Sequence, residues 1–324
     1  MKPRDRAWIE IDLGAIVDNY RVVQQTVGAH TIVMAVVKAD AYGHGAVPVS
    51  RALQAAGCGF FAVATLDEAV DLREAGIGGM VLVLGCTPHE CAGDLRQWRI
   101  TPAVMCVEDC LAFAREGGDS PVPVHIKVDS GMCRMGVRHD QITQFCESVG
   151  GIDGIAFEGI FSHFASAASD AEFSDLQIDN YLRAVAVAEQ MLGPFKWQHM
   201  CASSAILLYK RAHFNLVRPG DLLYGMSEDV PEGLLPAVRP ALALKSRLRL
   251  IKPVQAGERV GYGGTYQAPT AHDIGVVTIG YADGYPRLLS NAADVLIRGK
   301  RRPLVGRVSM DTIIVDLGVG HDCQ

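Results

Sequence analysis

The feature that most constrains the fold is a series of short, almost continuously apolar runs in the first two thirds of the chain. Continuous apolarity is typical of strands buried on both faces of a parallel sheet. Eight such runs occur, at residues 31–39, 60–65, 81–85, 102–106, 122–129, 155–163, 196–202 and 214–218. With helical segments between them, they predict a (β/α)8 barrel, and a doubly wound open sheet is the alternative. The open sheet is disfavoured because no GxGxxG follows the first strand.

The segments between the runs carry helical signals. Apolar residues recur at helical spacing over 49–56, and Gly57 then ends the predicted helix. Thr65 followed by Glu68 predicts a capping box, in which each side chain bonds a backbone N–H, at the start of a helix that ends at Gly76. The alternation of strand and helix therefore continues across the predicted barrel.

The chain changes character near Pro240. From Leu242 to Leu250 leucines alternate with other residues, a pattern typical of half-buried strands. The cluster RGKRRP at 298–303 is expected to form a hairpin turn. We predict a barrel over residues 11–231 and a mainly antiparallel β domain over 232–324, joined by an N-terminal strand at 7–12.

Composition excludes several classes of protein. The 324 residues carry a net charge of −6 without a lysine- or arginine-rich face, which argues against a nucleic-acid partner. No apolar run approaches the ~20 residues that a membrane span requires. The nine cysteines are an odd number without a CxxC pair, so neither a disulfide framework nor a metal site is expected. We expect a cytoplasmic protein.

Chemically active side chains cluster at the predicted strand ends. In a parallel barrel the catalytic groups gather where the strands end. Each of these residues alone is also explained as an ordinary strand-end charge or a buried polar group, but together they predict a site. They are Lys38, Asp40, Tyr42, Lys127, Asp129, Arg134, His163, Ser203, Ser204 and Arg218.

Two loops predict a phosphate site. The loops after strands seven and eight commonly bind phosphate in such barrels, and here they hold Ser203, Ser204 and Gly220. A phosphate site beside a lysine at a strand end indicates pyridoxal 5′-phosphate (PLP) held by Lys38 as a Schiff base.

Seven segments in order resemble the motifs of bacterial alanine racemases. They are AVVKADAYGHGA, HIKVDSGMCRMGV, GIFSHFA, LVRPGDLLYG, GYGGTY, TIGYADGY and GRVSMD, and they span most of the chain. The resemblance implies a PLP-dependent isomerase that interconverts L- and D-alanine and supplies D-alanine for the cell wall. It also implies a homodimer whose active site is shared across the interface.

The resemblance also implies a role for each matching residue. Lys38 binds the cofactor and moves a proton on one face of the substrate, and Tyr262 of the partner subunit is the base on the other face. Arg218 faces the pyridine nitrogen. The remaining roles are stacking beside the ring by His163, phosphate binding by Tyr42, Ser204, Gly220 and Asp221, substrate contacts by Arg134, Met310 and Tyr281, and a lysine that some members carry as a carbamate, Lys127.

The assigned chemistry agrees with the residue types. Racemisation requires a proton to leave one face of the α-carbon and return to the other, so two groups must flank it. A guanidinium such as that of Arg218 can only donate hydrogen bonds, so it keeps the pyridine nitrogen unprotonated and weakens the ring as an electron sink. That favours racemisation over transamination, and a decarboxylase of basic amino acids would use an acid there.

Two positions depart from the family pattern. Ser203 stands where family members commonly have Asn, and the chain ends at DLGVGHDCQ where family members continue and supply another tyrosine. The β domain is therefore expected to be incomplete. A serine or broader-specificity racemase and a non-catalytic PLP-binding protein remain alternatives.

Overall fold

The computed structural model describes residues 6–117, 120–226 and 230–321. They form two compact units, one from the described part of residues 11–241 and the other from residues 242–321 together with residues 6–10. Arg239 belongs to the first unit, because its guanidinium pairs with the carboxylates of Asp12 and Asp18, each at 3.1 Å. The boundary between the two units thus follows residue 241, whereas the prediction from the sequence put it between residues 231 and 232.

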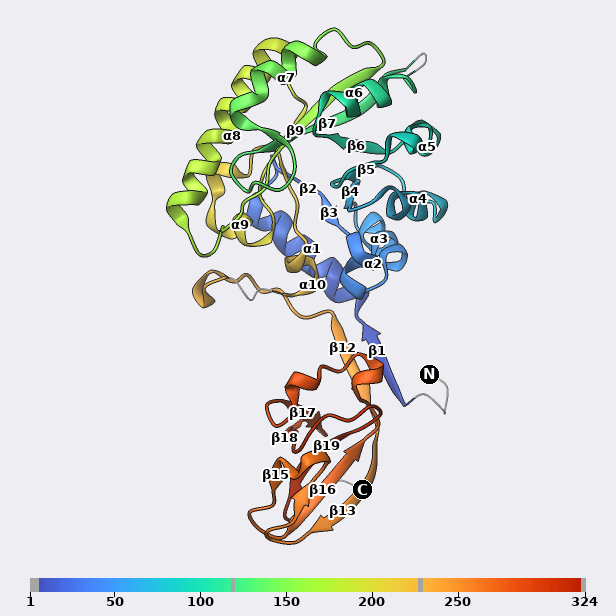
Figure 1. Ribbon diagram of the computed structural model, residues 1–324, viewed down its shortest axis with the longest axis vertical. Helices are drawn as coiled ribbons and strands as arrows, with labels where there is room; N and C mark the ends of the chain where they lie inside the picture. Colours follow the sequence, from blue (N-terminus) through green and yellow to red (C-terminus); the bar gives the residue numbers. More distant parts are fainter. Residues whose placement is uncertain (1–5, 118–119, 227–229, 322–324) are drawn as a thin grey trace. The chain divides into compact units, whose positions relative to one another are not determined.

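The first unit is a parallel barrel, as the apolar runs predicted (Figure 1). The described strands pair in parallel around the ring, so the fold class is confirmed. The strands are β2 (Ile32–Val33), β3 (Ala35–Val36), β4 (Phe60–Val63), β5 (Met80–Val83), β6 (Thr101–Val104), β7 (Val122–Asp129), β9 (Ile155–Phe161), β10 (Trp197–His199) and β11 (Leu216–Val217). The short strand β8 (Val137–Arg138) pairs with β7 outside the ring.

One strand, interrupted at Met34, closes the barrel. Its first half, β2, pairs with β11, and its second half, β3, pairs with β4. The Met34 N–H donates to the Val217 carbonyl at 2.9 Å, and the Val37 N–H donates to the Ala62 carbonyl on the other side, also at 2.9 Å. Lys38 follows directly, at the point where this strand reaches the carboxyl end of the ring.

Alternation along the strands separates an inner from an outer core. Met34, Val36, Ala62, Leu82 and Leu216 form one buried cluster inside the ring. Their sequence neighbours belong to a second, larger cluster that includes the buried residues of the helices. This is the division expected of a closed barrel, in which successive side chains point to opposite faces.

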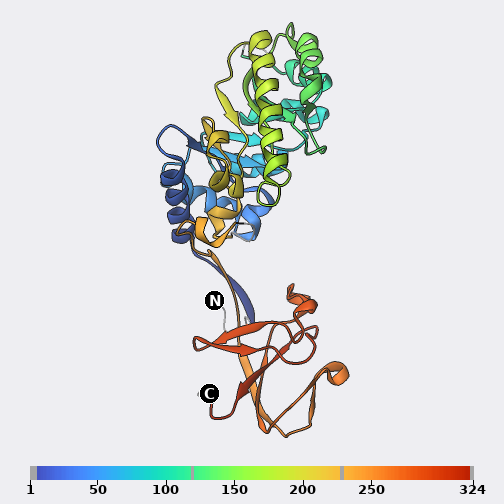
Figure 2. The same ribbon diagram turned by 90° about the vertical axis from the view of Figure 1, so that its left-hand side faces the viewer.

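Helices connect the strands around the outside of the ring. Figure 2 shows the long helix α8 lying along the outer side of the barrel. The predicted capping box of α4 is present, with Thr65 and Glu68 as its two members. The helices are α1 (Leu13–Val27), α3 (Ala46–Ala55), α4 (Leu66–Glu74), α5 (Ala92–Trp98), α6 (Val107–Ala114), α7 (Ile142–Val149), α8 (Ala171–Leu192), α9 (Ser203–Leu208) and α10 (Asp221–Tyr224). None of them, over the ranges described, has the length and apolarity that crossing a membrane requires.

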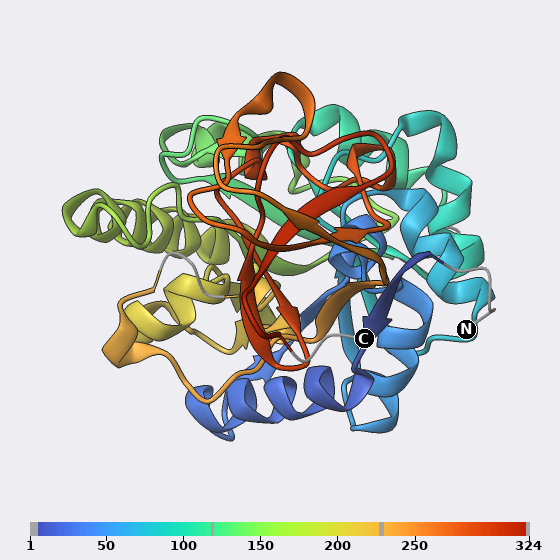
Figure 3. The same ribbon diagram turned by 90° about the horizontal axis from the view of Figure 1, so that it is seen from below.

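In the second unit the strand pairs that follow residue 247 are antiparallel and are shown in orange and red in Figure 3. Its central sheet has the order β13-β16-β19, and β1 pairs with β12. The hairpin expected at RGKRRP turns at Arg298 and Gly299, both with positive φ. The strands are β1 (Ala7–Ile11), β12 (Leu242–Ser246), β13 (Leu248–Val254), β14 (Arg259–Val260), β15 (Tyr266–Gln267), β16 (His272–Val277), β17 (Asp294–Ile297), β18 (Lys300–Pro303) and β19 (Ile313–Gly318).

The leucines of β12 and β13 are more exposed than their alternation predicted. Leu242, Leu244 and Leu250 are 37%, 46% and 54% exposed. The expectation that one face is buried is therefore wrong for β12 in the chain taken alone, whereas on β13 Leu248 and Ile251 pack against the core and Val254 is buried. The most buried side chains of the central sheet lie on β19, where Val315 and Leu317 are fully buried.

Candidate active site

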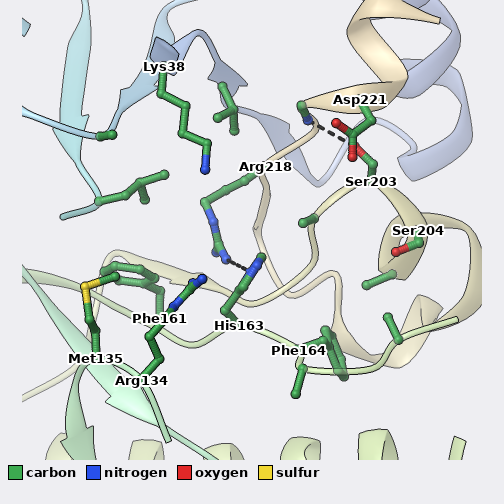
Figure 4. A pocket seen from close by; sticks show the side chains of 18 of the residues that line it. Lys38, Arg134, Met135, Phe161, His163, Phe164, Ser203, Ser204, Arg218 and Asp221 are labelled. Carbon is green, nitrogen blue, oxygen red and sulfur yellow. Dashed lines mark hydrogen bonds between the residues drawn. The ribbon is translucent and has the colours of Figure 1, made fainter. Parts of the chain in front are cut away.

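The barrel encloses a cavity of about 470 Å³ that is lined by residues at or just after the strand ends (Figure 4). Its volume falls in the range of small-molecule sites. Figure 4 shows Lys38, Arg134, His163 and Arg218 directed toward one another across the space. Ten of the predicted barrel residues line this one cavity, namely Lys38, Tyr42, Lys127, Arg134, His163, Ser203, Ser204, Arg218, Gly220 and Asp221. The predicted Asp40 and Asp129 do not, and their carboxylates instead accept backbone N–H groups of their own loops.

The segment after Lys38 is a left-handed turn, labelled α2 (Lys38–Gly43) in Figure 1. Four consecutive residues, Ala39 to Tyr42, have φ between 51° and 56° and ψ between 35° and 52°. None of the four is glycine, so each costs about 1–2 kcal/mol relative to the right-handed conformation. Such strain persists where surrounding contacts impose it, and it concentrates at functional sites. The turn brings both Lys38 and Tyr42 to the cavity.

Arg218 is a buried cation held by neutral acceptors. Its side chain donates to the carbonyls of Ser162 at 2.8 Å and Met200 at 3.1 Å. Its Nη1 lies 2.6 Å from Nδ1 of His199. Burial lowers the pKa of Arg218 to about 10, so the guanidinium remains charged at neutral pH. Because it carries only donors, it fixes the protonation of its neighbours.

That constraint determines the tautomers of two histidines. His199 Nδ1 must accept from Arg218, so its Nε2 carries the proton and donates to Nδ1 of His125 at 2.9 Å. His125 is then protonated at Nε2, a buried atom with no hydrogen-bond partner among the described residues. The ring of His125 occupies the space beside Gly159, where an added Cβ would lie 2.5 Å from it. A chain of hydrogen bonds thus runs outward from Arg218, in which Arg218 donates to His199 and His199 donates to His125.

Burial, together with repulsion among the cavity's cations, lowers the pKa values of two groups that line it. Burial, followed by the nearby charges of Arg218 and Arg134, lowers the pKa of Lys127 to about 8. The same causes lower the pKa of His163 to about 3, with Lys127 and Lys38 contributing. Lys127 donates to the Leu84 carbonyl at 2.9 Å. Asp221 is the one acid in the lining of the cavity, so the site favours an anionic occupant.

The two predicted phosphate loops are joined by Ser203. Its hydroxyl oxygen accepts the N–H groups of Gly220 at 3.0 Å and Leu222 at 3.2 Å. Gly220 leaves room for the phenol of Tyr42, because an added Cβ would lie 2.3 Å from the phenol oxygen. Burial, and then the charge of Asp221, raises the pKa of Tyr42 to about 12, so this phenol stays a hydrogen-bond donor. Ser203 holds the loops together, and Tyr42 and Ser204 present hydroxyls to the cavity.

The other three predicted residues belong to the second unit, and the cavity lining does not include them. Tyr262 starts a short turn, η5 (Tyr262–Gly264), between β14 and β15 and is 72% exposed. Tyr281 and Met310 are 45% and 53% exposed. They lie on neighbouring segments, since the Tyr281 N–H donates to the Ser309 carbonyl and the next N–H to the Met310 carbonyl, both at 3.0 Å.

Sequence reasoning missed two members of the cavity's surroundings. Phe161 lines the cavity, with its ring 5.2 Å from the Arg218 guanidinium carbon and stacked on His199 at 4.8 Å. Its place at the end of β9, two residues before His163, was the available signal. The loop 164–169 also lines the cavity, and apart from Phe164 its side chains are small alanines and serines that carry no chemical signature.

Comparison with known proteins agrees with this geometry. The family model described as the N-terminal domain of alanine racemase matches residues 11–228, and the model of the C-terminal domain matches residues 241–324. The alanine racemase of Desulfovibrio desulfuricans is 40% identical over 315 residues, covering 96% of this chain and 84% of that protein. The chain belongs to the alanine racemase family. The resemblance carried by the seven motifs is thereby confirmed.

Solved alanine racemases share the fold of this family member. The Bacillus anthracis enzyme with bound L-Ala-P has a TM-score of 0.87 at 35% identity, covering 100% of this chain and 84% of that one. The Bartonella henselae enzyme with covalently bound pyridoxal phosphate has a TM-score of 0.87 at 30% identity, covering 99% and 88%. Both likenesses extend over almost the whole chain.

The two histidines beyond Arg218 are expected to stay neutral over the physiological range of pH. Burial, and then the charge of Arg218, lowers the pKa of His125 to about 3 and that of His199 well below 6.5. The unfolded chain binds these protons below about pH 6.5, so the stability they contribute is present above that pH and lost as the pH falls toward 3. Each imidazole should contribute a slope of about 1.4 kcal/mol per pH unit to the free energy of unfolding.

NMR of ring-labelled histidine and urea unfolding between pH 7.5 and 5 check this expectation. The ring signals of His125 and His199 should not titrate, while exposed His30 serves as the internal control. A midpoint near 6.5 for either buried ring would contradict the assigned tautomers.

Proposed function

We propose that this protein is a PLP-dependent alanine racemase that uses two groups on opposite faces of the substrate, Lys38 and Tyr262 of the partner subunit. The supporting observation is the cavity itself, in which Lys38, two arginines and a hydroxyl-bearing loop converge at one barrel mouth. Family membership indicates the same reaction. Racemisation needs a proton removed at the α-carbon from one side and returned from the other.

The residues of the cavity fit PLP. The site is rich in donors and cations, and the absence of a Cβ at Gly220 lets the Tyr42 hydroxyl lie close to the backbone of the predicted phosphate loop. We propose that Tyr42, Ser204 and the backbone at Gly220 and Asp221 hold the phosphate, with Ser203 fixing the two loops. Lys38 would bind the cofactor covalently, and His163 would lie beside its ring. When bound, PLP supplies an acceptor for the electron pair left on the α-carbon.

Arg218 sets how strongly that acceptor works. The guanidinium stays charged and only donates, so it would face the pyridine nitrogen without protonating it. Its other donors are already held by the carbonyls of Ser162 and Met200. The result is a weak electron sink, which favours prompt return of the proton. Arg134 would bind the substrate carboxylate and orient the α-carbon between the two proton-transferring groups.

The second proton-transferring group is proposed to come from another copy of the chain. Tyr262, Tyr281 and Met310 are exposed on the second unit, as are the leucines of β12 and β13. Burying these side chains against a partner subunit would remove their apolar area from water, at about 25 cal/mol per Å². We therefore propose a homodimer in which Tyr262, Tyr281 and Met310 of the partner subunit complete the site.

We also propose that the protein works in the cytoplasm and supplies D-alanine for the cell wall. The eight described cysteines are free thiols, the form that a reducing compartment maintains.

Proton NMR of L-alanine in D₂O, with purified protein and added PLP, tests the function. We expect loss of the α-proton signal and equal amounts of D- and L-alanine at the end. The Lys38→Ala variant should show neither, and borohydride reduction should leave no PLP mass on it. A parallel serine sample ranks the two substrates. No exchange by the wild-type protein would contradict a racemase and favour PLP binding without catalysis.

Replacing Tyr262 tests the second proton-transferring group. In Tyr262→Phe we expect conversion of L-alanine to slow by about 10²-fold or more, the usual contribution of such a group. Covalent attachment of PLP to Lys38 should be unchanged, because Lys38 lies in the other unit. Tyr285→Phe, at a partly buried tyrosine of the same unit, is the matched control. Wild-type rates with both enantiomers would exclude Tyr262 from this role.

Lys127 is proposed to carry a carbamate. Its pKa of about 8 leaves an appreciable neutral fraction near pH 7, and only the neutral amine reacts with carbon dioxide. The product would replace a cation with an anion among the cavity's arginines. ¹³C NMR in ¹³C-bicarbonate should show a carbamate signal that grows from pH 7 to 9. The signal should vanish in Lys127→Ala and persist in Lys196→Ala, a change at an exposed lysine.

A further inference from the structure

Glu68 connects the helix after β4 to the turn that holds Lys38. Its Oε1 accepts the N–H of Ala39, the residue directly after Lys38, at 2.6 Å. Its Oε2 accepts the N–H groups of Ala64 at 2.7 Å and Thr65 at 3.3 Å, at the end of the neighbouring strand. One carboxylate therefore bridges two strand ends that are far apart in sequence.

The left-handed turn requires such an external acceptor. Ala39 to Tyr42 all lie in a backbone region that residues other than glycine avoid. Within the turn, Ala41 N–H donates to Val37 and Gly45 N–H to Asp40, both at 2.9 Å, but the Ala39 N–H donates to Glu68. At the far end Asp40 Oδ1 accepts the Ala46 N–H at 2.7 Å. Two carboxylates thus hold the turn at its two ends.

We propose that Glu68 is a positioning residue for Lys38, fixing the strained turn so that the lysine amine and the Tyr42 hydroxyl reach the cavity together. Hydrogen bonds to a charged carboxylate are stronger than neutral ones, which suits a contact that must oppose backbone strain. This inference rests on the proposed function for the role of Lys38. The bridge itself is independent of that function.

A simpler role for Glu68 is that of the capping-box residue of α4, where it accepts the Thr65 N–H while Thr65 accepts the Glu68 N–H at 3.3 Å. The two roles use different oxygens. Glutamine also serves in a capping box. Its amide has one accepting oxygen, which satisfies two N–H groups when it faces Ala64 and Thr65 but only one when it faces Ala39. Glu68→Gln should therefore keep the cap and lose the bridge.

The experiment compares Glu68→Gln with Thr65→Ala, which removes the other half of the cap and leaves the bridge. Hydrogen–deuterium exchange on the PLP-free protein follows the amides of residues 38–45 and of α4 separately. Borohydride trapping measures how fast PLP attaches to Lys38, and kcat and KM are measured with L-alanine. For Glu68→Gln we expect faster exchange at 38–45, and slower attachment and kcat by about tenfold, with KM little changed. Thr65→Ala should speed exchange in α4 alone.

Two results would overturn the proposal. One is wild-type exchange at 38–45 together with wild-type attachment in Glu68→Gln, and the other is that Thr65→Ala reproduces the losses of Glu68→Gln. If the wild-type protein does not racemise alanine, the proposed function fails. The exchange comparison between the two variants still decides whether Glu68 holds the turn.

Discussion

The structure of the site depends on a guanidinium buried inside the barrel, that of Arg218, which pairs with no carboxylate among the described residues. A buried charge is costly unless its donors find partners, and those of Arg218 are two carbonyls and the imidazole nitrogens of His199 and, at 3.5 Å, His163. A carboxylate would neutralise the charge and weaken its action on a ligand. Neutral acceptors leave the full positive charge facing the cavity. The tautomers of His199 and His125 and the stacking of Phe161 then follow from the burial of the Arg218 guanidinium among neutral acceptors.

Barrel topology makes that arrangement possible. Arg218 follows β11, Lys38 follows β3, and the interrupted strand β2–β3 pairs with β11 on one side and β4 on the other. The two cations therefore start from adjacent strand ends. Glu68 acts at the next junction, between β3 and β4. Residues that are far apart in the chain are neighbours because the ring closes, and the local turn geometry only adjusts their final direction.

Sequence reasoning recovered what depends on apolar runs and their ends. The barrel, the helix starting at Thr65 and the residues lining the cavity all follow from buried strands and from where they stop. The left-handed turn could not be predicted in this way. None of its four residues, Ala39 to Tyr42, is glycine, and the conformation is imposed by contacts with distant residues. The pairing of His125 with His199 also depends on strand register, which single runs do not fix. The exposure of Leu244 was missed because alternation shows which side chains share a face, not what covers it.

The charges of the cavity act against one another before any ligand binds. The mutual repulsion of Arg218, Arg134, Lys127 and Lys38 contributes to the low pKa values of Lys127 and His163. A ligand with phosphate and carboxylate groups relieves that repulsion. Part of its binding energy therefore comes from neutralising positive charges that repel one another in the empty cavity. Whatever binds the folded protein and not the unfolded chain stabilises the fold. The same cations that orient such a ligand therefore make the barrel more stable once the ligand is bound. The added stability also helps to hold the strained turn at Lys38 in its left-handed conformation.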